Sequence, residues 1–162
     1  MNVQNNMFTL LITIQNKPGA LFKISGLIRK HRFNIESMTL ARTENTTLHH
    51  LTMLLKGDKE MAERLSKQLS RIIEVVKVSE PGCEDIVTRE LALIKVSLTQ
   101  PGSQEEILQL LDLFRFQVID IHPDYLMLEL TGNIMKIEAF YEHMKKFGVL
   151  EFVRTATTGL VK

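Results

Sequence analysis

The stretch MFTLLITIQNKPGALFKISGLIRK, residues 7–30, decides the fold. Residues 7–15 are an apolar run rich in β-forming residues, which predicts a buried strand. Asn-Lys-Pro-Gly at 16–19 interrupts that run. Beyond it, apolar residues recur on one face of a helix: Ala20, Leu21, Ile24, Leu27 and Ile28. The stretch therefore predicts a strand, a short turn and an amphipathic helix, with Pro18 at the first helical position.

The rest of the chain continues this order and then repeats it. Strands are predicted at 33–42, 51–55 and 75–78, and a second helix opens at Gly57-Asp58. The segment at 81–88 contains Pro and Gly and indicates a linker. Further strands are predicted at 91–98, 116–121, 125–130 and 149–153. Two more helices are predicted, one from Ser103, with Glu106 completing a capping-box pattern, and one from Gly132-Asn133 that ends at Gly148.

The order βαββαβ, found twice, predicts an α+β fold of two tandem ferredoxin-like domains. Each domain is expected to form an antiparallel sheet with its helices on one face. The predicted division is 1–80 for the first domain, 81–88 for the linker and 89–162 for the second domain. Both domains are small, and several strand positions that face away from the helices are apolar. We therefore expect the chain to form a homodimer.

Composition argues against several classes of function. The 162-residue chain has 20 basic and 19 acidic residues, so no basic excess indicates a nucleic-acid partner. The apolar run near the N-terminus is too short to span a membrane and has no basic leader, so we expect a cytoplasmic protein without membrane contact. Cys83 is the only cysteine, which rules out an intrachain disulfide and a cysteine metal cage.

The turn at 16–19 and the first helical residues carry the candidate chemistry. Gly19 lets a ligand approach the backbone, and the free N–H groups of the first helical turn favour a carboxylate. Asn16 adds an amide donor and a carbonyl acceptor. An α-amino acid needs this combination, because its carboxylate requires donors and its ammonium group requires an acceptor. The same tetrapeptide also occurs in plain strand-to-helix turns, where Asn and Pro-Gly serve conformation alone.

Other polar clusters give weaker signals. Asn34 starts the second strand, and it either enters the sheet from the helix or supplies polar contacts to a ligand held by a neighbouring subunit. His49 and His50 are adjacent on a predicted strand, where neighbours point to opposite faces, so we expect a solvent-exposed strand start and no shared metal ion. No nucleotide-binding or metalloenzyme motif occurs, so we expect no catalytic residue, no metal site and no cofactor.

The chain resembles a known family. Asn16 to Leu21, followed by Asn34-Ile35-Glu36-Ser37, is similar to an ACT domain, a small ligand-binding module of amino-acid metabolism. Further motifs narrow the resemblance to the small (regulatory) subunit of acetolactate synthase, also called acetohydroxyacid synthase. These motifs are Lys67-Gln68-Leu69, Val75-Val76-Lys77-Val78, Arg89-Glu90-Leu91-Ala92-Leu93-Ile94-Lys95-Val96, Val118-Ile119-Asp120 and Thr131-Gly132. The resemblance covers almost the whole chain.

The resemblance implies a non-catalytic dimer that binds valine, or leucine or isoleucine, where two first domains pair. The ligand residues would be Asn16, Gly19, Ala20 and Leu21 of one subunit and Asn34 and Ile35 of the other. The implied partner is a thiamine-diphosphate-dependent large subunit, which the small subunit activates and makes sensitive to feedback inhibition. The alternative is a stand-alone ACT-type sensing module that acts on a different enzyme or regulator. A small ferredoxin-like enzyme and a purely structural dimerisation protein are further alternatives.

The sequence departs from the family pattern at three places. His49-His50 stands where a Ser-Arg pair is usual, and Phe116 replaces a glycine. Ala156 stands where a glycine commonly follows an Arg-Ser/Thr pair. The expected ligand residues match the family, so we expect these departures to affect partner contacts more than amino-acid sensing.

Overall fold

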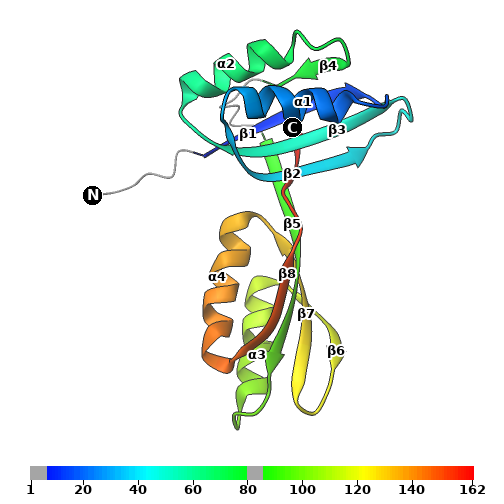
Figure 1. Cartoon of the computed structure of the whole chain (residues 1–162). Helices are drawn as coiled ribbons and strands as arrows, with labels where there is room; N and C mark the ends of the chain where they lie inside the picture. The colour runs from blue at the N-terminus through cyan, green and yellow to red at the C-terminus, as the bar shows by residue number, and fades with distance from the viewer. Residues whose placement is uncertain (1–6, 80–85) are drawn as a thin grey trace. The chain divides into compact units, whose positions relative to one another are not determined.

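The computed structural model describes residues 7–79 and 86–162, which fold into two compact units (Figure 1). One unit comprises Met1–Val87 and Thr157–Lys162, and the other comprises Thr88–Ala156. Each unit contains an antiparallel sheet and two α-helices, which confirms the predicted α+β fold of tandem ferredoxin-like domains. Most of the expected linker at 81–88, with Cys83, lies outside the described residues, so the predicted domain boundaries stay predictions.

The first unit follows the predicted order βαββαβ. Its elements are β1 (Met7–Gln15), α1 (Ala20–Lys30), β2 (Asn34–Arg42), β3 (Leu48–Lys56), α2 (Lys59–Leu69) and β4 (Val75–Val78). The four strands form a sheet in the order β2-β3-β1-β4, which leaves β2 and β4 at its edges. The two helices lie on one face of this sheet (Figure 1). Asp58 caps α2 by accepting a hydrogen bond from Met61 N–H at 2.8 Å, at the position where the sequence predicted that the helix opens.

Alternate positions on the two central strands, β1 and β3, face the helices and form the core. The core residues are Leu10, Ile12, Ile14, Ala20, Ile24, Ile28, Leu51, Met53, Leu55, Leu65 and Leu69. Leu11, Thr52 and Leu54 are also buried but lie outside this cluster, because successive strand residues point to opposite faces. The face of the sheet without helices is therefore covered as well.

A short terminal strand, β9 (Thr158–Val161), helps to cover that face and was not predicted from the sequence. It groups with the first unit and pairs with β5 (Ile86–Ser97). Gly159 N–H donates to Thr52 Oγ1 at 3.2 Å, and His50 Nε2 donates to Gly159 O at 2.9 Å. His50 is half-buried, and so is His49, so the prediction of a solvent-exposed strand start is wrong for both residues.

The second unit repeats the arrangement. After β5 come α3 (Ser103–Phe114), β6 (Gln117–Ile121), β7 (Tyr125–Gly132), α4 (Ile134–Met144), the 3-10 turn η1 (Lys145–Phe147) and β8 (Val149–Arg154). The strand order is β6-β7-β5-β8. A separate apolar cluster, which includes the fully buried Ile94, Leu128 and Phe140, forms its core. No helix among the described residues is long and apolar enough to cross a membrane.

The two helices of the second unit begin differently. Asn133 caps α4 by accepting a hydrogen bond from Lys136 N–H at 2.8 Å, at the position where the sequence predicted that the helix opens. The residue before α3 is Gly102, which has φ 77 and no capping side chain. The predicted capping box is therefore wrong: Ser103 is already the first helical residue, and Glu106 forms an ion pair with Lys146 instead.

Candidate functional site

A tight turn joins β1 to α1. Ala20 N–H donates to Lys17 O at 3.2 Å, and Gly19 has φ 84 and ψ −9. With Pro18 at the preceding position, these values define a type II β-turn, whose third residue requires a positive φ. Gly19 is therefore the N-cap of α1 and Ala20 begins the helix, so the prediction of Pro18 as the first helical residue is wrong.

The first turn of α1 presents backbone donors. Lys23 N–H is the first to bond back into the helix, to Gly19 O at 3.0 Å. The N–H groups of Leu21 and Phe22 come before it and have no hydrogen-bond partner among the described residues. A Cβ atom placed on Gly19 meets nothing within 4 Å, so the approach to this turn is open. Free amides and the helix dipole together favour a carboxylate here.

Two of the predicted ligand residues contribute their side chains to the core. Ala20 is 2% exposed and belongs to the buried cluster, and Leu21 packs against that cluster. Any contact that they make with a ligand at the turn therefore comes from their backbone.

Asn16 is fixed at the end of β1 by hydrogen bonds to the turn between β2 and β3. Its N–H donates to Thr47 O at 2.8 Å, and its side-chain Nδ2 donates to Thr46 O at 3.2 Å. With the side-chain nitrogen used in this way, Asn16 Oδ1 remains as a hydrogen-bond acceptor. An acceptor at this position suits an ammonium group.

A pocket of about 280 Å³ lies beside Asn16 and is also lined by Arg42, Leu48 and His49. Arg42 and His49 are directly opposite each other on the paired strands β2 and β3. The Arg42 guanidinium supplies donors that match a carboxylate, and Leu48 supplies apolar surface. The sequence interpretation missed Arg42 and His49, because only the register of β2 against β3 brings them to Asn16.

The other two predicted ligand residues, Asn34 and Ile35, lie at the opposite end of β2. Asn34 is paired with Lys56 on β3, and its Nδ2 donates to Glu36 Oε1 at 2.6 Å. Because β2 is nine residues long, its two ends are about 26–30 Å apart. Within one protomer the structure therefore brings Asn16, Gly19, Ala20 and Leu21 together, but not Asn34 and Ile35.

An ion pair ties α1 to the segment before β4. Lys23 Nζ lies 2.5 Å from Glu74 Oε1, and Gln15 N–H donates to Glu74 O at 2.8 Å. The hydrogen bond from Lys23 is the main cause that holds the pKa of the Glu74 carboxyl below its ordinary value. These contacts tie the start of α1 to the segment before β4 and to the end of β1.

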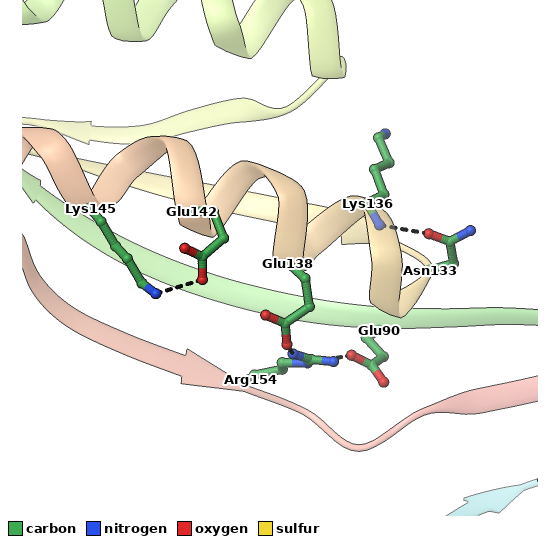
Figure 2. Close-up of polar contacts among 7 residues, drawn as sticks. All are labelled: Glu90, Asn133, Lys136, Glu138, Glu142, Lys145 and Arg154. Carbon is green, nitrogen blue, oxygen red and sulfur yellow. Dashed lines mark hydrogen bonds and ion pairs between the residues drawn. The ribbon is translucent and has the colours of Figure 1, made fainter. Parts of the chain in front are cut away.

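In the second unit, the most connected charged group is Arg154 at the end of β8. It pairs with Glu90 of β5 and Glu138 of α4, both at 2.5 Å (Figure 2). The Glu90 side chain is only 4% exposed. The three residues join a strand, a neighbouring strand and a helix, so their contacts tie these elements of the second unit together.

The described residues offer no group of three or more His, Cys, Asp or Glu side chains that could hold a metal ion. What the first unit does offer is a small pocket with an acceptor and a cationic donor, and free backbone amides at the nearby start of α1 in the sequence; both suit a zwitterionic ligand. Comparison with known proteins shows the family of the chain. Residues 10–77 match the model of the AHAS small subunit-like ACT domain, and residues 89–162 match the model of the small subunit of acetolactate synthase.

The chain belongs to the acetolactate synthase small subunits. A small subunit from Bacillus subtilis is 37% identical over 155 residues, which are 94% of this chain and 89% of the relative. One from Mycobacterium bovis is 36% identical over 152 residues, which are 94% of this chain and 90% of the relative. The crystal structure of the acetolactate synthase small subunit from Thermotoga maritima superimposes with a TM-score of 0.84 at 34% identity, over 96% of this chain and 97% of that one.

These matches confirm the resemblance inferred from the motifs. The first unit is an ACT domain, and the whole chain is a small, regulatory subunit of acetolactate synthase. The small subunits that it matches are aligned along nearly their full length, so both units belong to the family pattern.

Proposed function

We propose that this small subunit acts in the cytoplasm as a homodimer that binds valine, or a related branched-chain amino acid, between two ACT domains. In this proposal it activates the catalytic large subunit and confers feedback inhibition on it. The subunit itself holds no cofactor, and the thiamine diphosphate chemistry belongs to the large subunit. The observation that carries the proposal is the position of Asn16 and Arg42 at one end of the edge strand β2.

Pairing of two copies through β2 explains how the separated ligand residues can act together. β2 is an edge of its sheet, and an edge strand has unpaired backbone groups that can accept another strand. If two β2 strands pair antiparallel about a two-fold axis, the start of one strand lies beside the end of the other. Asn34 of one copy then approaches Arg42 and Asn16 of the second. The arrangement creates two equivalent ligand sites per dimer.

Each part of the ligand has a matching group in this arrangement. The carboxylate meets the free amides at the start of α1 and the guanidinium of Arg42. The ammonium group meets Asn16 Oδ1, and the aliphatic side chain packs between the two copies beside Leu48. The ligand then shifts the large subunit by favouring one dimer arrangement, with a coupling free energy of about 1–3 kcal/mol.

The decisive experiment combines this subunit with a purified acetolactate synthase large subunit and measures turnover with and without valine, leucine and isoleucine. We expect the subunit to raise turnover and one of the amino acids to lower it again. Gly19→Asp is expected to weaken amino-acid binding at least about tenfold, because it places a negative charge where the carboxylate binds. Binding is measured by calorimetry on the isolated subunit.

Two matched variants separate charge from other effects. Gly19→Asn has nearly the same shape and also tolerates the positive φ of this position, so it should weaken binding much less than Gly19→Asp. Gly26→Asp adds the same charge at an exposed position of the same helix, where a Cβ meets nothing within 4 Å. It should leave binding unchanged. Equal binding by Gly19→Asp and the unmodified subunit contradicts the proposed site.

A further inference from the structure

A second concave surface lies on the face of the ACT-domain sheet that carries no helices. It is a groove of about 530 Å³, and one of its walls is the C-terminal strand β9. Every residue that lines it belongs to the first compact unit. Its volume falls within the range of about 300–1,000 Å³ that is usual for small-molecule sites.

A row of side chains crosses the sheet at the base of this groove. Lys77 is paired with Thr13, Thr13 with His50, and His50 with Ala41 on the four successive strands. All four line the groove, on the side opposite the helices, because the neighbouring Ile12 and Leu51 belong to the core. Across this row the groove therefore offers an ammonium group, a hydroxyl and an imidazole.

The imidazole of His50 is already engaged. Its Nε2 lies 2.9 Å from Gly159 O, and because a carbonyl oxygen only accepts, Nε2 carries a proton and donates it. Gly159 is held from its other side as well, since its N–H donates to Thr52 Oγ1. These two hydrogen bonds seat β9 on the sheet, so the wall of the groove is fixed rather than a loose tail.

The charged groups of the groove are mostly cationic and uncommitted. Arg42 and Lys77 line it, and within the described residues neither has a carboxylate oxygen within 4.0 Å. The acidic residue of the lining, Glu44, is exposed on the turn between β2 and β3 and forms no ion pair with them. Opposite the cations, Leu160 and Val161 of β9 supply apolar surface.

We infer that this groove is a second ligand site of the subunit and that it takes a small organic anion with a short apolar part, such as an aliphatic carboxylate. The anionic group lies beside Lys77 and the Thr13 hydroxyl, and the apolar part packs on β9. The site is separate from the turn at Gly19, although Arg42 contributes to the lining of both pockets. Lys77 belongs to the groove alone and therefore reports on it specifically.

The test titrates the full-length subunit with hexanoate and follows backbone amide resonances by NMR. Hexanoate is expected to cause saturable shifts of the Thr13, Lys77 and Gly159 resonances. 1-Hexanol has the same apolar part without the charge and should cause no such shifts. Lys77→Gln is expected to raise the hexanoate Kd at least about fivefold, because the ligand then loses one charge contact that is partly exposed to water. Lys67→Gln removes the same charge from the exposed side of α2 and should leave the Kd unchanged.

The same titration in the Gly19→Asp variant separates this site from the amino-acid site. Hexanoate shifts at Gly159 should persist there, even though valine binding is expected to be weakened. Several results overturn the inference: shifts confined to the start of α1, equal saturation by 1-hexanol, or a Kd unaffected by Lys77→Gln. Inorganic phosphate is titrated in parallel, and equal or tighter binding of phosphate also overturns it, because the apolar wall then contributes nothing.

Discussion

Phe116 shows how one residue that departs from the family pattern is accommodated. Arg115 ends α3 in the left-handed conformation, with φ 54, and turns the chain so that Phe116 points into the core. Phe116 is 8% exposed, and its ring centroid lies 5.0 Å from that of Phe140 and 5.8 Å from that of Phe114. The aromatic ring adds apolar contact that a glycine cannot make, so this departure strengthens the second unit rather than disturbing it.

Arg154 permits a stability prediction for the second unit. Burial tends to lower the pKa of its guanidinium, but the hydrogen bonds to Glu90 and Glu138 outweigh burial and raise it. Arg154→Leu removes the cation that faces the buried Glu90 carboxylate. We expect the free energy of unfolding of the second unit to fall by about 1–3 kcal/mol, a range that allows for the partial exposure of Arg154. The measurement is native-state hydrogen exchange of the β5 and β7 amides.

The control for this prediction is Glu138→Gln. The Glu138 side chain is 52% exposed, so its ion pair is screened by water and its loss should cost less than about 0.5 kcal/mol. If Arg154→Leu and Glu138→Gln lower the free energy of unfolding by similar amounts, the buried contact between Arg154 and Glu90 does not stabilise the unit more than the exposed one.

At the scale of elements, β2 is the strand on which the proposed dimer depends. Thr39 lies next to its midpoint and faces away from the helices, because it is paired with Thr52. In an antiparallel β2–β2 pair, residues near the midpoint approach their own copies. Thr39→Lys therefore brings two like charges together, and we expect the dimer Kd to rise at least about tenfold. Sedimentation velocity over a range of concentrations measures it.

The matched control is Thr131→Lys, which adds the same charge at an exposed position of β7 in the second unit. It should leave the dimer Kd unchanged. If Thr39→Lys sediments as the unmodified subunit does, the two copies do not pair through the centre of β2, and the proposed ligand site has to be completed in another way.

Periodic elements were predictable from the sequence, and features that depend on pairing were not. The helices and the central strands follow from apolar spacing, and Asp58 and Asn133 cap where their side-chain chemistry indicates. Gly19 was predictable because the turn before α1 needs a residue that adopts a positive φ. Asn16 was predicted from the donor and the acceptor of its side chain. Arg42 required the β2–β3 register, which a single sequence does not specify.

The β9 strand could not be predicted for a similar reason. Its four residues, Thr158–Val161, show no apolar alternation, and their place on the sheet depends on single hydrogen bonds to distant residues. The capping box at Ser103 failed because Gly102 adopts a positive φ and forms the same type II turn as Gly19. Backbone conformation therefore overrode a side-chain motif at α3.

At the scale of the whole molecule, the chain passes between the two units twice. It leaves the first unit between Val87 and Thr88 and returns to it between Ala156 and Thr157. The return is secured on the ACT-domain sheet by the bonds of Gly159 to His50 and Thr52. The two units are thus joined by two covalent connections rather than one.

Removal of residues 157–162 leaves a single connection between the units. We expect the shortened subunit to keep its valine affinity, since Asn16 and Gly19 are untouched, but to transmit less inhibition to the large subunit. The free energy of unfolding of the ACT domain should also fall by about 1–2 kcal/mol, because His50 and Thr52 lose their hydrogen bonds to Gly159. Valine affinity, by calorimetry, and turnover of the large subunit are measured on the same preparation.

The control for this prediction is Leu160→Ser, which changes an exposed position of β9 and keeps the strand. Full inhibition by the shortened subunit, with unchanged valine affinity, shows that the first connection alone carries the signal.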